Sequence, residues 1–129
     1  MSQYMLLIYA PAEGGPSPEQ LEAEMPAWFQ ITEELRSSGA LVAGEALQPT
    51  ETARTVRVRS GERQVTAAPF ASTPEVLTGF YVIEADGIGA AEEWAARLPN
   101  APYGSVEVRP LMVFPDSEPA AAGQASAGA

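Results

Sequence analysis

The apolar run YMLLIYA at residues 4–10 most constrains how this chain can fold. An unbroken apolar run followed by the turn-rich segment PAEGGPSP is typical of a central strand that is covered on both faces. The run is too short to cross a membrane, and it lacks the basic flank and small-residue cleavage site of a secretory signal. We therefore expect a domain that is built around this strand and lies in the cytoplasm.

A helix start follows the first strand. Ser17 is suited to cap a helix, Pro18 fits its first position, and Gln20 completes a capping box. Apolar residues then recur at helical spacing until Ser38 and Gly39, which should end the helix. Pro26 falls inside this stretch and is expected to kink the helix or split it in two.

The rest of the chain alternates between strand and helix patterns. Strands are predicted at 41–47, 53–60, 63–66, 78–84 and 104–114, with a hairpin turn at 60–62 and a helix at 89–98. This order is the split βαβ pattern of an α+β, ferredoxin-like domain with an inserted β-hairpin, spanning residues 1–115. Residues 116–129 are poor in bulky apolar side chains and are predicted to be a disordered tail.

A ferredoxin-like sheet has its helices on one face, so the other face needs a cover. A second copy of the chain is the expected cover, which predicts a homodimer. The chain has no Cys and no His, which excludes disulfides, thiolate nucleophiles and imidazole bases. No phosphate-binding glycine motif is present, and we expect neither a metal nor another cofactor.

The formal net charge is −10, from 17 acidic and 7 basic residues, all of the latter Arg. Such a surface disfavours nucleic acid and anionic membranes as partners. Four arginines gather in the predicted hairpin, at Arg54, Arg57, Arg59 and Arg63. They are predicted to keep an exposed strand from pairing, and an acidic partner is the alternative.

Three charged residues are candidate catalytic groups. Glu45 lies in an apolar strand, where it is either an exposed carboxylate or part of a pocket. Glu107 and Arg109 are two residues apart and share one side of their strand, either as a surface ion pair or as a base with an anion-binding guanidinium. Candidate ligand-binding aromatics are Tyr9, Trp28, Phe70 and Tyr81, for which core packing is the alternative.

Several short segments resemble the DGPF branch of the YCII-related family: MLLIYA, TEELRSSGALVAGEALQP, TVRV, VTAAPFA, GFYVIEA, AAEEWAARLP and GSVEVRP. The resemblance covers residues 4–110 and implies ferredoxin-like chains that pair into a dimeric α+β barrel. The Asp-Gly-Pro-Phe motif that gives the branch its name falls on Ala67-Ala68-Pro69-Phe70, so its carboxylate is missing here. The wider superfamily's His-Asp pair is missing as well.

Two functions follow from these observations. The first is a homodimeric, cofactor-independent barrel that binds a small, partly apolar metabolite and runs isomerase, lyase or cyclase chemistry. In it, Glu45 or Glu107 would move the proton and Arg109 would hold the developing negative charge. The second is a non-catalytic ligand sensor or accessory protein of a regulatory or biosynthetic system, which the alanines at 67 and 68 and the absence of His favour.

Overall fold

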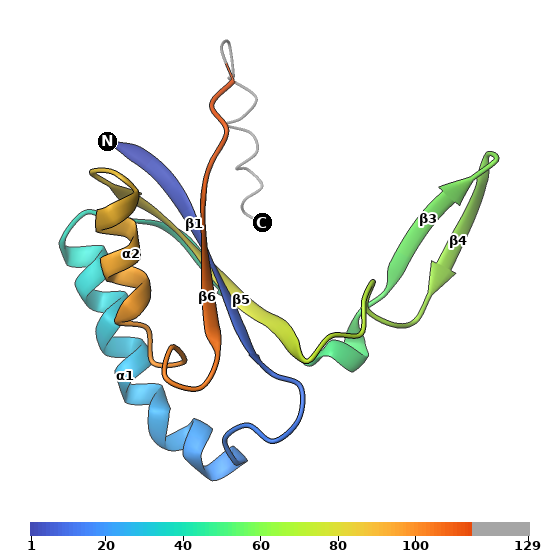
Figure 1. Cartoon of the computed structure of the whole chain (residues 1–129), viewed down its shortest axis with the longest axis horizontal. Coiled ribbons are helices and arrows are strands. Elements are labelled where there is room, and N and C mark those ends of the chain that lie inside the picture. Colours follow the sequence, from blue (N-terminus) through green and yellow to red (C-terminus); the bar gives the residue numbers. More distant parts are fainter. Residues whose placement is uncertain (115–129) are drawn as a thin grey trace.

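The computed structural model describes residues 1–114 and shows an α+β fold. Four antiparallel strands form one sheet in the order β2-β5-β1-β6. The strands are β1 (Ser2–Pro11), β2 (Leu41–Ala46), β5 (Glu75–Ala85) and β6 (Ser105–Pro110). Helices α1 (Pro18–Ser37) and α2 (Ile88–Ala96) lie on the same side of this sheet (Figure 1). The arrangement is compatible with the predicted ferredoxin-like fold; the predicted tail at 116–129 lies outside the described residues.

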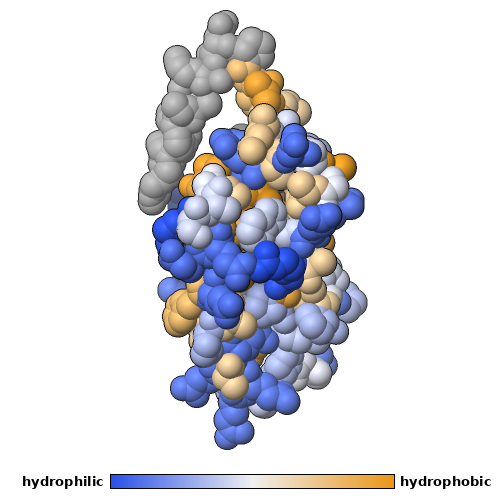
Figure 2. All heavy atoms as spheres, turned by 90° about the vertical axis from the view of Figure 1, so that its left-hand side faces the viewer, coloured by the Kyte–Doolittle hydropathy of each residue, from blue (hydrophilic) through white to orange (hydrophobic). Residues whose placement is uncertain are grey.

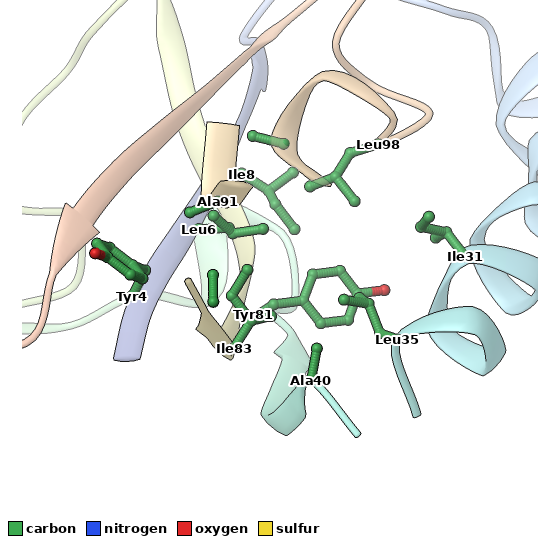
Figure 3. Packing of buried hydrophobic residues seen from close by; sticks show 12 residues of the cluster. Tyr4, Leu6, Ile8, Ile31, Leu35, Ala40, Tyr81, Ile83, Ala91 and Leu98 are labelled. Carbon is green, nitrogen blue, oxygen red and sulfur yellow. The ribbon is translucent and has the colours of Figure 1, made fainter. Parts of the chain in front are cut away.

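The hydrophobic core lies between the sheet and the two helices. Strand alternation turns Leu6 of β1 and Ile83 of β5 toward the helices, where both are fully buried. Leu35 of α1 and Leu98, just after α2, meet them from the helical side (Figure 3). The core cluster is therefore one-sided; Val82, on the second face, is buried but lies outside this cluster.

Helix α1 begins as its sequence predicts and is not split. The Ser17 hydroxyl accepts a hydrogen bond from the Gln20 backbone N–H at 3.1 Å, and the Gln20 side chain accepts one from the Ser17 N–H at 2.8 Å. Pro26 lies inside a single helix of 20 residues, so the expectation of two pieces is wrong. Its exposed position and the proline-free turns on either side let the helix continue past the missing N–H.

The insertion is a separate two-stranded hairpin of β3 (Thr55–Arg59) and β4 (Glu62–Thr66). Ser60 and Gly61 form its turn with φ of 53° and 77°, the two positive values that a type I′ turn requires. A short 3₁₀ turn at Thr50–Thr52 precedes it. The hairpin projects away from the sheet on the side opposite the helices (Figure 1).

Two strand boundaries differ from the sequence prediction by three residues or more, because the extent of a strand depends on its neighbours. β6 ends at Pro110 and not at Phe114: Pro110 pairs with Tyr4, and beyond it the Leu111 N–H donates one further hydrogen bond to β1, to the Gln3 carbonyl at 2.9 Å. β5 begins at Glu75 and not at Thr78, because Pro11 at the end of β1 provides a partner for Glu75. Pairing between distant segments sets these limits.

Candidate functional site

The face of the sheet away from the helices, called the open face below, carries an apolar centre between charged edges. Glu45, Phe80, Leu7 and Glu107 form one row across all four strands, each paired with the next. The neighbouring row is formed by Ala43, Val82, Met5 and Arg109. Phe80, Val82, Leu7 and Met5 therefore lie on the two central strands, and the charged groups lie on the edge strands.

Three polar side chains meet on the β1–β6 side of the open face. The Tyr9 hydroxyl donates a hydrogen bond to Glu107 Oε1 at 3.4 Å, and Arg109 Nε lies 3.8 Å from Glu107 Oε2. Burial, followed by the charge and hydrogen bond of Glu107, raises the pKa of Tyr9 above its usual value, although Arg109 opposes the shift. The Glu107 side chain is 46% exposed and that of Arg109 is 69% exposed, so both are accessible to a ligand. Tyr9, Glu107 and Arg109 are called the open-face triad below.

Glu45 shares the open face with the triad but lies on the opposite edge strand. It is exposed and pairs with Phe80. Neighbouring strands lie about 4.8 Å apart, so Glu45 and Glu107 are separated by roughly 14 Å across the sheet. The two carboxylates can border one ligand but cannot act on the same atom.

Two of the predicted ligand-binding aromatics lie on the other side of the sheet. Tyr81 is buried against α1, where its hydroxyl is 2.5 Å from Thr32 Oγ1. Trp28 stacks on Tyr81 with ring centroids 6.5 Å apart. Both residues pack between the sheet and α1, apart from the open-face triad.

Phe70 and the alanines at the family motif lie at the base of the hairpin. Phe70 is 77% exposed, and the Arg57 guanidinium lies over its ring at 5.4 Å. The Ala68 carbonyl accepts a hydrogen bond from the Thr55 hydroxyl at 2.8 Å. The motif segment thus anchors the hairpin, and Phe70 is available at its surface.

A second polar cluster was not predicted from the sequence. Glu24 of α1 accepts hydrogen bonds from the Tyr103 hydroxyl at 2.8 and 2.9 Å and from Trp28 Nε1 at 2.7 Å. Glu24 and Tyr103 line an open cavity of about 450 Å³ beside Gly14 and Gly15. Glu24 and Trp28 stand four residues apart in the sequence, but nothing local indicates that Tyr103 folds against them.

Neither a metal cluster nor a membrane-crossing helix is found in the described part of the chain. Among residues 1–114, no three Asp or Glu side chains gather closely enough to hold a metal ion. No helix in that range combines the length and apolar character that crossing a bilayer requires.

These features define an α+β protein whose antiparallel sheet is covered by helices on one face and presents charged groups around an apolar centre on the other. The chain belongs to the YCII-related family, because the model of the YCII-related domain matches residues 2–115. An uncharacterized protein of Rhizobium meliloti (strain 1021) is 36% identical over 104 residues, which make up 79% of this chain and 84% of that protein. The YCII-related family expected from the quoted segments is thereby confirmed, and the DGPF branch stays a prediction.

Proposed function

We propose that two copies of this chain pair through their open faces as a dimeric α+β barrel of the DGPF branch, and that the enclosed space binds a small, partly apolar metabolite with an anionic group. The observation that supports this proposal is the apolar centre of the open face with the triad at its border. Phe80 and Leu7 would contact the apolar part of the ligand. Arg109 would bind its carboxylate or enolate oxygen, a task suited to a guanidinium.

The triad also has the groups needed for acid/base chemistry. In an isomerisation, the Glu107 carboxylate would take a proton from a carbon next to a carbonyl, the C–H electron pair would move into an enolate, and Arg109 would hold the enolate oxygen. Where the enolate is conjugated with a C=C bond, Glu107 would then return the proton to the far carbon of that bond, so that the carbonyl re-forms and the double bond moves. Tyr9, with its raised pKa, stays protonated at neutral pH and would orient Glu107 by its hydrogen bond.

A non-catalytic sensor or accessory protein is the second candidate. Ala67 and Ala68 replace the Asp-Gly of the branch motif, which removes a carboxylate from the base of the hairpin. Within one chain, Glu45 is too far from Glu107 to be its partner in proton transfer. Both features fit a protein that has kept a binding surface and no longer needs a second catalytic carboxylate.

Light scattering and NMR would test the proposal and separate the two candidates. We expect a dimer mass, and we expect small aliphatic and aromatic 2-oxo acids to bind, as measured by isothermal titration calorimetry. Deuterium exchange of the 3-position protons in D₂O, followed by proton NMR, would report base catalysis. Loss of exchange in Glu107→Gln with binding retained supports the enzyme, and binding without exchange in the unmodified chain supports the sensor.

Glu45→Gln is the matched control, because it removes the same charge from the other edge of the open face. It should leave proton exchange within about twofold of the unmodified chain. A monomer at all concentrations, or binding that Arg109→Gln does not weaken, would contradict the proposed site.

A further inference from the structure

The hairpin β3–β4 presents apolar side chains that no other element of residues 1–114 covers. Val56 pairs with Val65 across the two strands, and Val58 lies on the same side of the hairpin. These valines are 60%, 48% and 61% exposed, respectively. A two-stranded hairpin alone is marginally stable in water, so a hairpin of this composition needs a surface to pack on.

Helix α1 carries an exposed apolar stripe with acidic borders. Leu21, Met25 and Phe29 recur every four residues and are 44%, 42% and 67% exposed. Phe29 turns furthest from the buried positions Ile31 and Leu35, and Leu21 borders them. Figure 2 shows the outer surface of the helical layer as mostly hydrophilic with separate apolar patches.

The two surfaces have opposite charge. Hairpin residues 54–63 contain Arg54, Arg57, Arg59 and Arg63 against one acid, Glu62. Helix α1 contains Glu19, Glu22, Glu24, Glu33 and Glu34 against one base, Arg36. On the hairpin, Arg63 pairs with Val58 and so lies on the side of the valines, whereas Arg57 and Arg59 lie on the other side. On α1, Glu24, Glu33 and Glu34 already bind other side chains, which leaves Glu19 and Glu22 as the acids near the stripe. A basic side chain therefore borders the hairpin valines, and acidic side chains border the α1 stripe.

We propose that the hairpin of one copy packs on the α1 stripe of a second copy, with Val56, Val58 and Val65 against Leu21, Met25 and Phe29. The hairpin does not contact α1 of its own chain, because the two lie on opposite sides of the sheet (Figure 1). In a two-fold dimer the contact is made twice, since each copy gives a hairpin and receives one. This inference rests on the homodimer proposed above and identifies a second contact that holds it together.

Crosslinking can test this contact cleanly because the chain contains no cysteine. Val58→Cys chains would be mixed and refolded with Leu21→Cys, Met25→Cys or Phe29→Cys chains and treated with a short bismaleimide. We expect at least one of the three mixtures to give a crosslinked pair at five times or more the yield of the control. The control mixture is Val58→Cys with Glu93→Cys, which is exposed on α2.

A second measurement covers the case in which crosslinks form by chance. Val56, Val58 and Val65 would be replaced together by Ser, and the dimer dissociation constant measured by analytical ultracentrifugation. We expect it to rise tenfold or more, whereas Gln64→Ser on the opposite side of the hairpin should change it less than twofold.

The two proposals fail in different ways. A stable dimer with no crosslink above the control and an unchanged dissociation constant in the triple variant would overturn the hairpin contact and leave the open-face dimer standing. A protein that is monomeric at all concentrations would overturn both.

Discussion

Among the glycines of residues 1–114, Gly104 leaves the least room for a side chain. A Cβ added there would collide with the Tyr9 carbonyl, which belongs to the backbone of β1 and cannot rotate away. It would also lie 3.3 Å from Asn100 Nδ2, which donates hydrogen bonds to the Tyr9 and Ser105 carbonyls at 2.9 and 3.1 Å. Gly104 therefore lets the loop before β6 pass close to the end of β1.

Gly104→Ala should lower the free energy of unfolding by about 1–3 kcal/mol, the usual cost of overpacking a closed site. Urea unfolding at one protein concentration would measure it as a lower midpoint with an unchanged slope. Gly89→Ala is the control, because nothing lies within 4 Å of a Cβ at this position in α2. That variant should be stabilised by about 0.5–1 kcal/mol, and an equal loss in both would contradict the argument.

Tyr103 makes the free energy of unfolding depend on pH in the alkaline range. Burial, the hydrogen bond to Glu24 and the charge of Glu24 raise the pKa of Tyr103 from 10.0 to about 12. Below pH 10.0 both the folded and the unfolded chain keep the phenol proton, so the contribution of this group is complete. Between pH 10.0 and about 12 the unfolded chain loses the proton first, so the free energy of unfolding should fall.

Tyr103→Phe should make this alkaline decline shallower. The decline should not vanish, because the raised pKa of Tyr9 acts in the same direction. Urea unfolding at several pH values in this window would compare the slopes. Identical slopes in the unmodified chain and the variant would show that Tyr103 titrates normally in the folded state.

At the scale of elements, the capping box at the start of α1 should stabilise the whole helix. Ser17→Ala removes the hydroxyl that accepts the Gln20 N–H, so the variant should lose about 1 kcal/mol of stability. Ser37→Ala, in the last turn of α1, is the control and should change stability by less than about 0.5 kcal/mol. Thermal or urea unfolding measures both, and equal effects would argue against a capping role.

Local signals predicted the elements well because each depends on neighbouring residues. Ser17 and Gln20 predicted the start of α1, and Ser60 with Gly61 predicted the hairpin turn. Alternation along β5 places Tyr81 and Ile83 on one side of the strand and Phe80 and Val82 on the other. The sequence did not tell which set would face the helices, because that choice depends on distant partners: Tyr81 lies over Gly44 and reaches Thr32.

The candidate site could be predicted only in part for the same reason. Spacing on one strand placed Glu107 and Arg109 together, and the structure adds Tyr9 from the neighbouring strand. Sequence alone did not separate Trp28 and Tyr81, which pack with α1, from Tyr9 on the open face. The cluster of Glu24 and Tyr103 joins residues that are 79 positions apart, and no local pattern indicates such a contact.

At the scale of the whole molecule, side chains of the open face are not needed to fold one copy, but they would form the contact between two copies. Leu7 lies in the middle of that face, between Phe80 and Glu107, and contributes nothing to the buried core on the helical side. A lysine at this position would place a charge in the centre of the proposed dimer interface. The cost of burying an unpaired ammonium is large, whereas the same group is harmless in water.

Leu7→Lys should therefore give a folded monomer. Light scattering should show half the mass of the unmodified protein, and the far-ultraviolet circular dichroism should be unchanged. Glu93→Lys, on the exposed surface of α2, makes a larger change in charge and should leave the dimer intact. Glu107 pairs with position 7 and can offset the added charge, so Leu7→Lys combined with Glu107→Gln is the stricter variant. If that double variant remains dimeric at micromolar concentration, the open faces do not meet.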